Sequence, residues 1–165
     1  MRLGAVSTRS VPPYIIDFGA LCFPVSPHAD LALIMRGSSA DTVVIRTDHG
    51  QIALNLYAAS GGAVAGYIGS CLRFFASENI DNERVEWVSQ HELAGTTCDG
   101  VHFRFIGVAG PGWFLRASVR SRQGYANEDI ETARQIVTRA RVTMPRHLFS
   151  GTPVELATEP VWRPL

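Results

Sequence analysis

The central hairpin of the fold is predicted from the segment Arg104-Phe105-Ile106-Gly107-Val108-Ala109-Gly110-Pro111-Gly112-Trp113-Phe114-Leu115-Arg116, which indicates two strands joined by a tight turn. A three-residue connection, Ala109-Gly110-Pro111, pairs Phe105 with Leu115 and brings the apolar residues of both strands onto one face. A connection of two or four residues would place these apolar sets on opposite faces. The sequence therefore predicts an antiparallel hairpin with an odd-length loop.

In this register Arg104 and Arg116 lie directly opposite each other, on the face away from the core. The other polar residues expected on that face are the next pair, His102 and Ser118, followed by Arg120 and, on a neighbouring strand, Arg46. Like charges directly opposite in a sheet are unfavourable by up to about 1 kcal/mol. The pair therefore favours a counter-charge, which is a bound anion, an acidic partner, or an acid on a covering helix or tail, such as Glu155 or Glu159. The alternative is a sheet face that is solvated and binds nothing.

Further strands are predicted on both sides of this hairpin. Residues 41–48 and 51–58 form a second hairpin around His49-Gly50, with Ile45 facing Leu54. Short strands are also predicted at 31–36 and 84–89, and residues 14–18 are a short apolar run. Pro24 and Pro27 indicate a loop, and residues 91–100 indicate a loop or short edge strand.

Two helices are predicted from spacings of three and four residues between apolar side chains. The first covers residues 64–79 and carries Val64, Ile68, Cys71, Leu72 and Phe75. The second begins at an N-cap, Asn127, with Glu128, Asp129 and Glu131 in its first turn and a buried stripe of Ile130, Ala133, Ile136, Val137 and Ala140. The predicted fold is an α+β sandwich, an antiparallel sheet of five to seven strands with both helices packed on one face.

The length of 165 residues predicts a single domain. Residues 1–13, which end in Pro12-Pro13, are expected to be a flexible N-terminal arm. Residues 14–144 form the α+β domain, and residues 145–165 form an extended proline-rich tail that docks on the domain or on a partner. The apolar residues that favour docking of the tail are Phe149, Val154, Leu156, Val161 and Trp162.

Composition excludes several functions. The net charge is zero, so no global field attracts nucleic acid or an anionic membrane. All 15 basic residues are arginine, which removes the lysine that phosphate-binding loops and Schiff-base enzymes need. The three cysteines form no C-x-x-C pair, and no stretch has the length or hydrophobicity of a signal peptide or membrane span. We expect a soluble cytoplasmic protein that does not interact with membranes.

Motifs for catalysis or cofactor binding are incomplete. The glycine-rich segment 61–69 lacks the spacing of a dinucleotide loop, and His91-Glu92 lacks the second histidine of a zinc site. Cys71 falls in the apolar stripe of its helix, where a buried cysteine is the simpler interpretation, although a hydrolase based on Cys71 or Ser70 stays a minor alternative. We expect no catalytic residue, metal or cofactor.

Two functions fit these observations. The first is a non-enzymatic interaction module, or a subunit of a larger assembly, that binds a protein partner or a second copy of itself. The second is a binder of an anionic small molecule or single-stranded nucleic acid, with Trp113 and Phe114 near for base stacking. The residues expected to bind the anion or partner are Arg104, Arg116, Arg120, Arg46 and His102.

Three segments also resemble a known family. Residues 17–24 match an acidic residue and L-G-A-L before a proline, residues 54–59 match an apolar strand ending in two alanines, and residues 104–116 match the frame R-F-x-G-V-D-G-P-R-W-x-L-R. Ala109 and Gly112 replace the aspartate and arginine of that frame. Over residues 14–156 the chain resembles a divergent member of the actinobacterial domain of unknown function 3710. The resemblance implies a bacterial source and no established activity.

Overall fold

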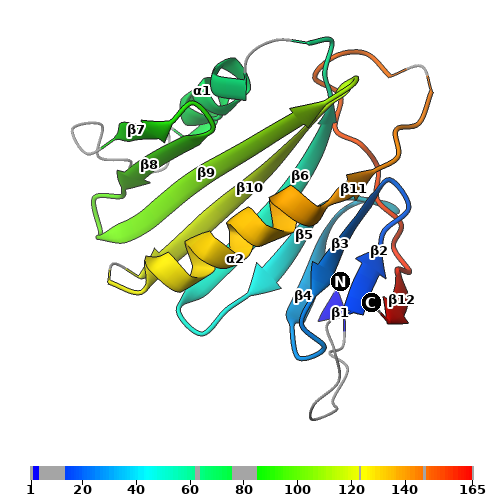
Figure 1. Cartoon of the computed structure of the whole chain (residues 1–165), viewed down its shortest axis with the longest axis horizontal. Helices are drawn as coiled ribbons and strands as arrows, with labels where there is room; N and C mark the ends of the chain where they lie inside the picture. Colours follow the sequence, from blue (N-terminus) through cyan, green and yellow to red (C-terminus); the bar gives the residue numbers. More distant parts are fainter. Residues whose placement is uncertain are drawn as a thin grey trace.

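The structure is a computed structural model of the chain and describes residues 2–3, 14–61, 64–75, 85–122, 124–146 and 148–164, with only the backbone described for 2–3 and 71–75. The described chain contains two antiparallel sheets and two helices. Figure 1 shows α2 lying across the larger sheet, with the smaller sheet beside it. The predicted α+β class, an antiparallel sheet with two helices packed on it, is confirmed.

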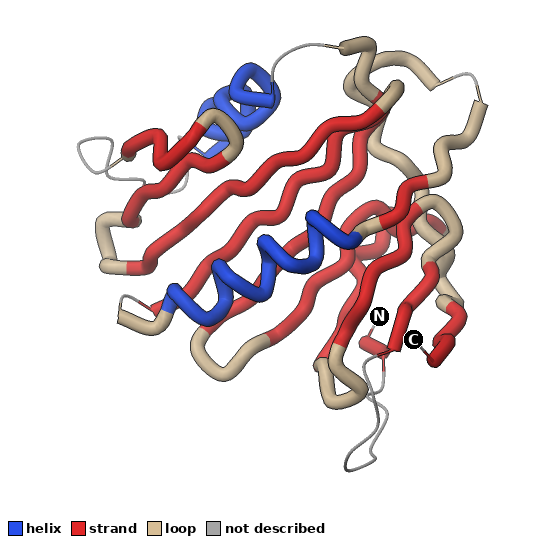
Figure 2. Tube along the Cα trace, viewed as in Figure 1, coloured by secondary structure: helices blue, strands red, loops and turns tan. Residues whose placement is uncertain are grey.

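The larger sheet has eight described strands in the order β1-β4-β5-β6-β10-β9-β8-β7, with antiparallel neighbours throughout. Its strands are β1 (Arg2–Leu3), β4 (Asp30–Arg36), β5 (Ser39–Arg46), β6 (Gly50–Ala58), β7 (Glu86–Ser89), β8 (Glu92–Thr96), β9 (Val101–Gly110) and β10 (Trp113–Arg122). The longest strands, β6, β9 and β10, run side by side through it, as Figure 2 shows.

The smaller sheet, which the sequence did not predict, has the order β11-β3-β2-β12. Its strands are β2 (Tyr14–Asp17), β3 (Leu21–Val25), β11 (Arg141–Val142) and β12 (Val161–Pro164). Pro24 was expected to mark a loop but lies within β3, opposite Ile15. In the described chain, β11 pairs with β3 only at Leu21 and Cys22, so β3 is open on that side at Pro24 and a residue without an N–H is tolerated there.

The two helices, α1 (Val64–Phe75) and α2 (Ala126–Arg139), cover opposite faces of the larger sheet. Leu115 of β10 belongs to the core beneath α2, whereas the adjacent Phe114 belongs to a second core with Ile68 of α1. Adjacent strand residues point to opposite faces, so these cores lie on either side of the sheet. We refer to the two sides as the α2 face and the α1 face. The prediction that both helices pack on one face was wrong.

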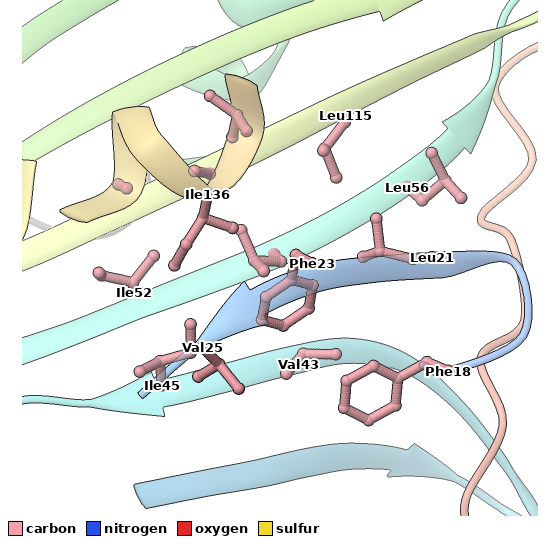
Figure 3. Close-up of a cluster of buried hydrophobic side chains, with 14 of the residues drawn as sticks. Phe18, Leu21, Phe23, Val25, Val43, Ile45, Ile52, Leu56, Leu115 and Ile136 are labelled. Carbon is pink, nitrogen blue, oxygen red and sulfur yellow. The ribbon is translucent and has the colours of Figure 1, made fainter. Parts of the chain in front are cut away.

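The larger core lies between the α2 face, α2 and the smaller sheet. Figure 3 shows Phe23 and Val25 of β3 gathered with Val43 and Ile45 of β5, and Ile136 of α2 beside them. All five side chains are buried, and each stabilises the fold by about 1.5–3 kcal/mol relative to an exposed position. This contact holds the two sheets together.

The hairpin of β9 and β10 has a two-residue turn, Pro111-Gly112, and not the predicted three-residue loop. Gly112 has a φ of 78°, in the left-handed region that glycine adopts without strain. In the observed register Arg116 lies opposite Gly107 and Arg104 lies opposite Val119. The two arginines therefore point to opposite faces of the sheet.

This register was mispredicted because both faces of the two strands are buried. Phe105 and Ile106 are each 3% exposed, and Phe114 and Leu115 are 2% and 0% exposed. When consecutive residues are apolar, a shift of one residue still pairs apolar with apolar, so hydrophobicity alone does not determine the register.

The hairpin of β5 and β6 was predicted on the correct segments but two residues out of register. Ile45 lies opposite Ile52, and the turn is Asp48-His49. Gly50 belongs to β6, where an added Cβ would lie 1.9 Å from the backbone oxygen of Arg120. The glycine is therefore needed for the close approach of β6 to β10, and not for the turn.

Residues 91–100, expected to be a loop or edge strand, contain β8, which lies between β7 and β9.

Helix α2 begins at Ala126 after Tyr125, whose side chain makes no capping bond, so Asn127 lies inside the helix and is not the N-cap. The predicted buried stripe of α2 is confirmed except at Ala140, which follows the last helical residue.

The described part of the tail packs on the rest of the chain. β12 pairs with β2, and Val154 and Leu156 are 0% and 2% exposed. Phe149, also expected to dock, is instead 87% exposed. At the other terminus β1 pairs with β4, and residues 4–13 of the predicted arm lie outside the described residues.

Candidate functional site

The structure divides the predicted anion-binding residues between the two faces of the larger sheet. Arg46, Arg116 and Arg120 lie on the α1 face, because Arg116 shares a row with Gly107 and Arg120 shares a row with Phe103. Arg104 and His102 lie on the α2 face, opposite Val119 and Ser121. The sequence had placed all five residues together.

On the α1 face Arg116, Ser118 and Arg120 occupy alternate positions of β10, so their side chains point the same way. Ser118 lies about 7 Å along the strand from each arginine. Arg46 of β5 joins the row of Arg120 through Gln51 of β6. We call Arg46, Arg116, Ser118 and Arg120 the arginine surface.

The guanidinium group of Arg116 is held in place by its neighbours. It donates a hydrogen bond from Nη2 to Oδ1 of Asn55 at 3.2 Å and lies 5.4 Å from the ring centroid of Tyr57. Asn55 in turn donates to the Thr42 hydroxyl at 2.7 Å. A chain of polar groups on β5 and β6 therefore orients this arginine.

Ser118 is the buried residue of the arginine surface, at 8% exposed. Within the part of the chain that the structure describes, its hydroxyl has no hydrogen-bond partner. The residues beside it in the row, Ala53 and Phe105, carry no polar side-chain group. An unsatisfied buried hydroxyl costs about 1–3 kcal/mol, so this position favours a polar group from outside the described residues.

On the α2 face Arg104 has the counter-charge that the sequence required, but it comes from β8. Glu92 accepts from Arg104 at 2.9 Å and from two nitrogens of Arg134 of α2 at 2.6 and 2.8 Å. The hydrogen bond from Arg134 lowers the pKa of Glu92, with a smaller contribution from Arg104, and burial opposes this shift. The bond to Glu92 raises the pKa of Arg134. This cluster fastens α2 to the sheet.

His102 lies beside this cluster on β9, opposite Ser121. Its Nε2 atom is buried and has no hydrogen-bond partner among the described residues. Burial lowers the pKa of His102, and the positive charge of Arg104 lowers it further. The imidazole is therefore kept neutral, which makes it unsuited to binding an anion.

Asp129 is an acid of the first turn of α2, as the sequence predicted, and it is also a buried link between elements. It is 6% exposed and accepts from the Thr47 hydroxyl at 2.8 Å and from the Ser121 hydroxyl. Sequence reasoning missed this role, and also missed Glu92 and Arg134. The Arg-x-Ser-x-Arg alternation at 116–120 places Ser118 between two arginines in any register, so the sequence put these three residues on one face, but Ser118 was not among the expected binding residues.

The remaining candidates do not form a site. Phe114 is 2% exposed and Trp113 packs against the larger core, so neither offers a free ring for base stacking. The side chain of Cys71 lies outside the described residues. In the ranges that are described, no three histidine, cysteine, aspartate or glutamate side chains come together as metal ligands. No helix of the described chain is long and apolar enough to span a membrane.

Comparisons with known proteins give one distant structure and one family. A crystal structure of a protein from Bacteroides thetaiotaomicron matches with a TM-score of 0.45 at 7% identity, over 86% of this chain and 52% of that chain, so this chain spans about half its length. No curated protein matches the chain. A family model described as a protein of unknown function (DUF3710) matches residues 6–146, and the chain belongs to this family.

Proposed function

We propose that the protein is a non-catalytic interaction module whose arginine surface binds an acidic group of a protein partner. The observation that carries this proposal is the buried Ser118 hydroxyl, which lacks a partner in the described chain and lies between Arg116 and Arg120 along β10. The hydroxyl is shielded from solvent in this structure, so the side chains around it must move before a carboxylate can accept a hydrogen bond from it, together with charge-assisted hydrogen bonds from the guanidinium groups.

An acidic protein segment fits this surface better than single-stranded nucleic acid. Binding of single strands depends on exposed aromatic rings that stack on bases. Beside the arginine surface, Tyr57 already lies against the guanidinium of Arg116, and Phe114 is buried beneath α1. Charge and hydrogen bonding remain as the means of recognition.

The described tail offers less for a partner than the arginine surface. Its apolar residues Val154 and Leu156 are buried within the chain, and β12 completes the smaller sheet. Arg46, in contrast, is exposed on the α1 face. These facts favour the arginine surface among the segments considered for binding.

Binding of a fluorescent decapeptide of alternating glutamate and serine, measured by anisotropy at low salt, tests the proposal. We expect saturable binding that weakens as salt is added. The double variant Arg46→Ala, Arg120→Ala should bind about tenfold more weakly, because each charge contributes up to about 1 kcal/mol. The matched control is Arg141→Ala, Arg146→Ala, which removes the same charge from exposed positions outside the arginine surface and should bind like wild type.

Two results would contradict the proposal. One is equal binding of the peptide by wild type and the Arg46, Arg120 double variant. The other is tighter binding of an oligothymidine than of the acidic peptide, since that result would assign the surface to nucleic acid.

A further inference from the structure

A groove runs along α2 on the side that faces the connection between β3 and β4. It contains two hollows of about 330 Å³ each, which share Ser26, Ala29 and Thr132 as lining residues and therefore adjoin. One wall is α2 and the other is the segment 24–29, and β5 with the turn after it forms the floor. The groove lies on the α2 face, so it is separate from the arginine surface and independent of the proposed function.

The two ends of the groove differ in chemistry. The hollow toward the C-terminus of α2 has an apolar lining that includes Val25, Ile45 and Ile136, with Arg139 at its edge. The hollow toward the N-terminus of α2 is lined by polar residues that include Asp48 and Glu128. A negative end, an apolar middle and a positive end follow one another along the helix.

The charged groups at the two ends are available to a ligand. Asp48, Glu128 and Arg139 are exposed, and none of them forms an ion pair within the described chain. Asp129, which also lines the polar hollow, is already bonded to Thr47. The unpaired charges therefore lie at opposite ends of the groove.

The spacing of these charges sets the length of a matching ligand. Glu128 and Arg139 are eleven residues apart on α2, which corresponds to about 16 Å along the helix axis. Both side chains can extend toward each other over the groove, so the charges of a ligand must be separated by roughly 10–16 Å. Each methylene that such a ligand buries over Val25 and Ile136 strengthens binding about fourfold.

We infer that this groove binds a linear amphipathic zwitterion, with a cationic amine between Asp48 and Glu128, an alkyl chain over Val25 and Ile136, and a carboxylate at Arg139. The opposite orientation would place like charges together at both ends. A ligand with one charge would leave one end of the groove unused. The ligand class is thus an ω-amino carboxylic acid or a molecule that contains one.

Amide chemical shifts of the full-length protein, titrated with ω-aminooctanoic acid, test this inference. We expect saturable shifts at residues of α2 and of the segment 24–29, at millimolar concentration. Octylamine and octanoic acid, which each lack one charge, should bind at least about fivefold more weakly, and ω-aminobutyric acid, which is too short, should give no saturable shifts.

Two variants of α2 distinguish the groove from the rest of the helix. Thr132→Trp fills the junction of the two hollows and should abolish binding, whereas Thr138→Trp adds the same ring at another exposed position of α2 and should leave binding unchanged. Saturable binding by Thr132→Trp would overturn the inference. Equal affinity for octylamine, or no saturable shift with ω-aminooctanoic acid, would also overturn it.

Discussion

The two faces of the larger sheet use the same strands in different ways. On the α2 face, Arg104 lies at the side of a continuous apolar core and is neutralised by Glu92, an acid of the same chain. On the α1 face, α1 covers a smaller core, and the arginine surface surrounds a buried hydroxyl, that of Ser118, without a partner in the described residues. Each face leaves a buried polar atom without a partner among the described residues, Nε2 of His102 on the α2 face and the Ser118 hydroxyl on the α1 face. The faces differ because the charge of Arg104 is neutralised by an acid of the same chain, whereas the Ser118 hydroxyl lies between Arg116 and Arg120 along β10.

This difference shows that the role of a charged strand residue depends on the face of the sheet to which its side chain points. Arg104 and Arg116 look equivalent in the sequence, yet one fastens a helix and the other belongs to a surface suited to binding. The larger core is therefore expected to determine stability, and the arginine surface to determine binding. Substitutions on each face can test this division.

Phe23→Ala should cost about 3–5 kcal/mol of unfolding free energy, because it opens a cavity between the two sheets. Ile68→Ala, in the α1 core, should cost less, because among the described residues that core has six buried members against twenty-four beneath α2. Urea unfolding followed by circular dichroism measures both. An equal or greater loss for Ile68→Ala would contradict the proposed division between the faces.

Glu92→Ala should destabilise the protein by about 3 kcal/mol, because it leaves Arg104, 13% exposed, without its buried counter-charge. The matched control is Glu131→Ala, whose carboxylate is 60% exposed and lies 3.6 Å from Arg134. This variant should cost less than about 0.5 kcal/mol. Chemical unfolding measures the loss of unfolding free energy in both variants. Equal losses would refute the structural role of the cluster.

Gly107→Ala should cost about 1–3 kcal/mol and loosen α1, because the new Cβ would lie 2.7–2.8 Å from atoms of Phe114, Ile68 and Val64. Gly66→Ala is the control within α1, since its Cβ would meet nothing within 4 Å and alanine favours a helix by up to about 1 kcal/mol. Hydrogen exchange should therefore be faster across α1 in the first variant and slower in the second. The opposite pattern would disprove the packing of α1 on Gly107.

The stability of the protein should fall as the pH drops below 6.5, in part because of His102. Its pKa is lowered in the folded state, so below 6.5 the unfolded chain takes up a proton that the folded chain does not. The His102→Gln variant lacks this group and should lose less stability between pH 6.5 and 5 than wild type. Thermal unfolding across this range measures the difference, and parallel curves would show that burial of His102 does not matter.

Much of the fold was predictable because local pattern determines it. The family, the α+β class, both hairpin segments and the buried stripe of α2 follow from motifs, turn residues and the periodicity of apolar residues. The smaller sheet was not predicted for two reasons. Its strands β11 and β12 pair with segments far away in the sequence, such as Trp162 with Ile16, and the local hairpin of β2 and β3 was concealed by Pro24, which indicated a loop.

The candidate site was half predictable. Arg116 and Arg120 were placed on one face correctly, because residues on one strand keep their alternation in any register. Arg46, on another strand, lies on the same face because the register of β5 and β6 brings it into the row of Arg120. Arg104 and His102 were placed wrongly, since their face depends on the length of one turn, and buried residues on both sides of the strands concealed that length. Glu92 was missed because its strand was expected to be irregular.

Ser118→Ala separates the role of the arginine surface in binding from its role in stability, because loss of the hydroxyl should weaken binding without lowering stability. Removing a buried, unsatisfied hydroxyl should leave the urea midpoint unchanged or raise the unfolding free energy by up to about 1 kcal/mol. The same variant should bind the alternating glutamate and serine peptide about fivefold more weakly, since it lacks the hydroxyl that donates to a carboxylate of the peptide. A Ser118→Ala protein that is as stable as wild type and binds the peptide equally well would contradict the account.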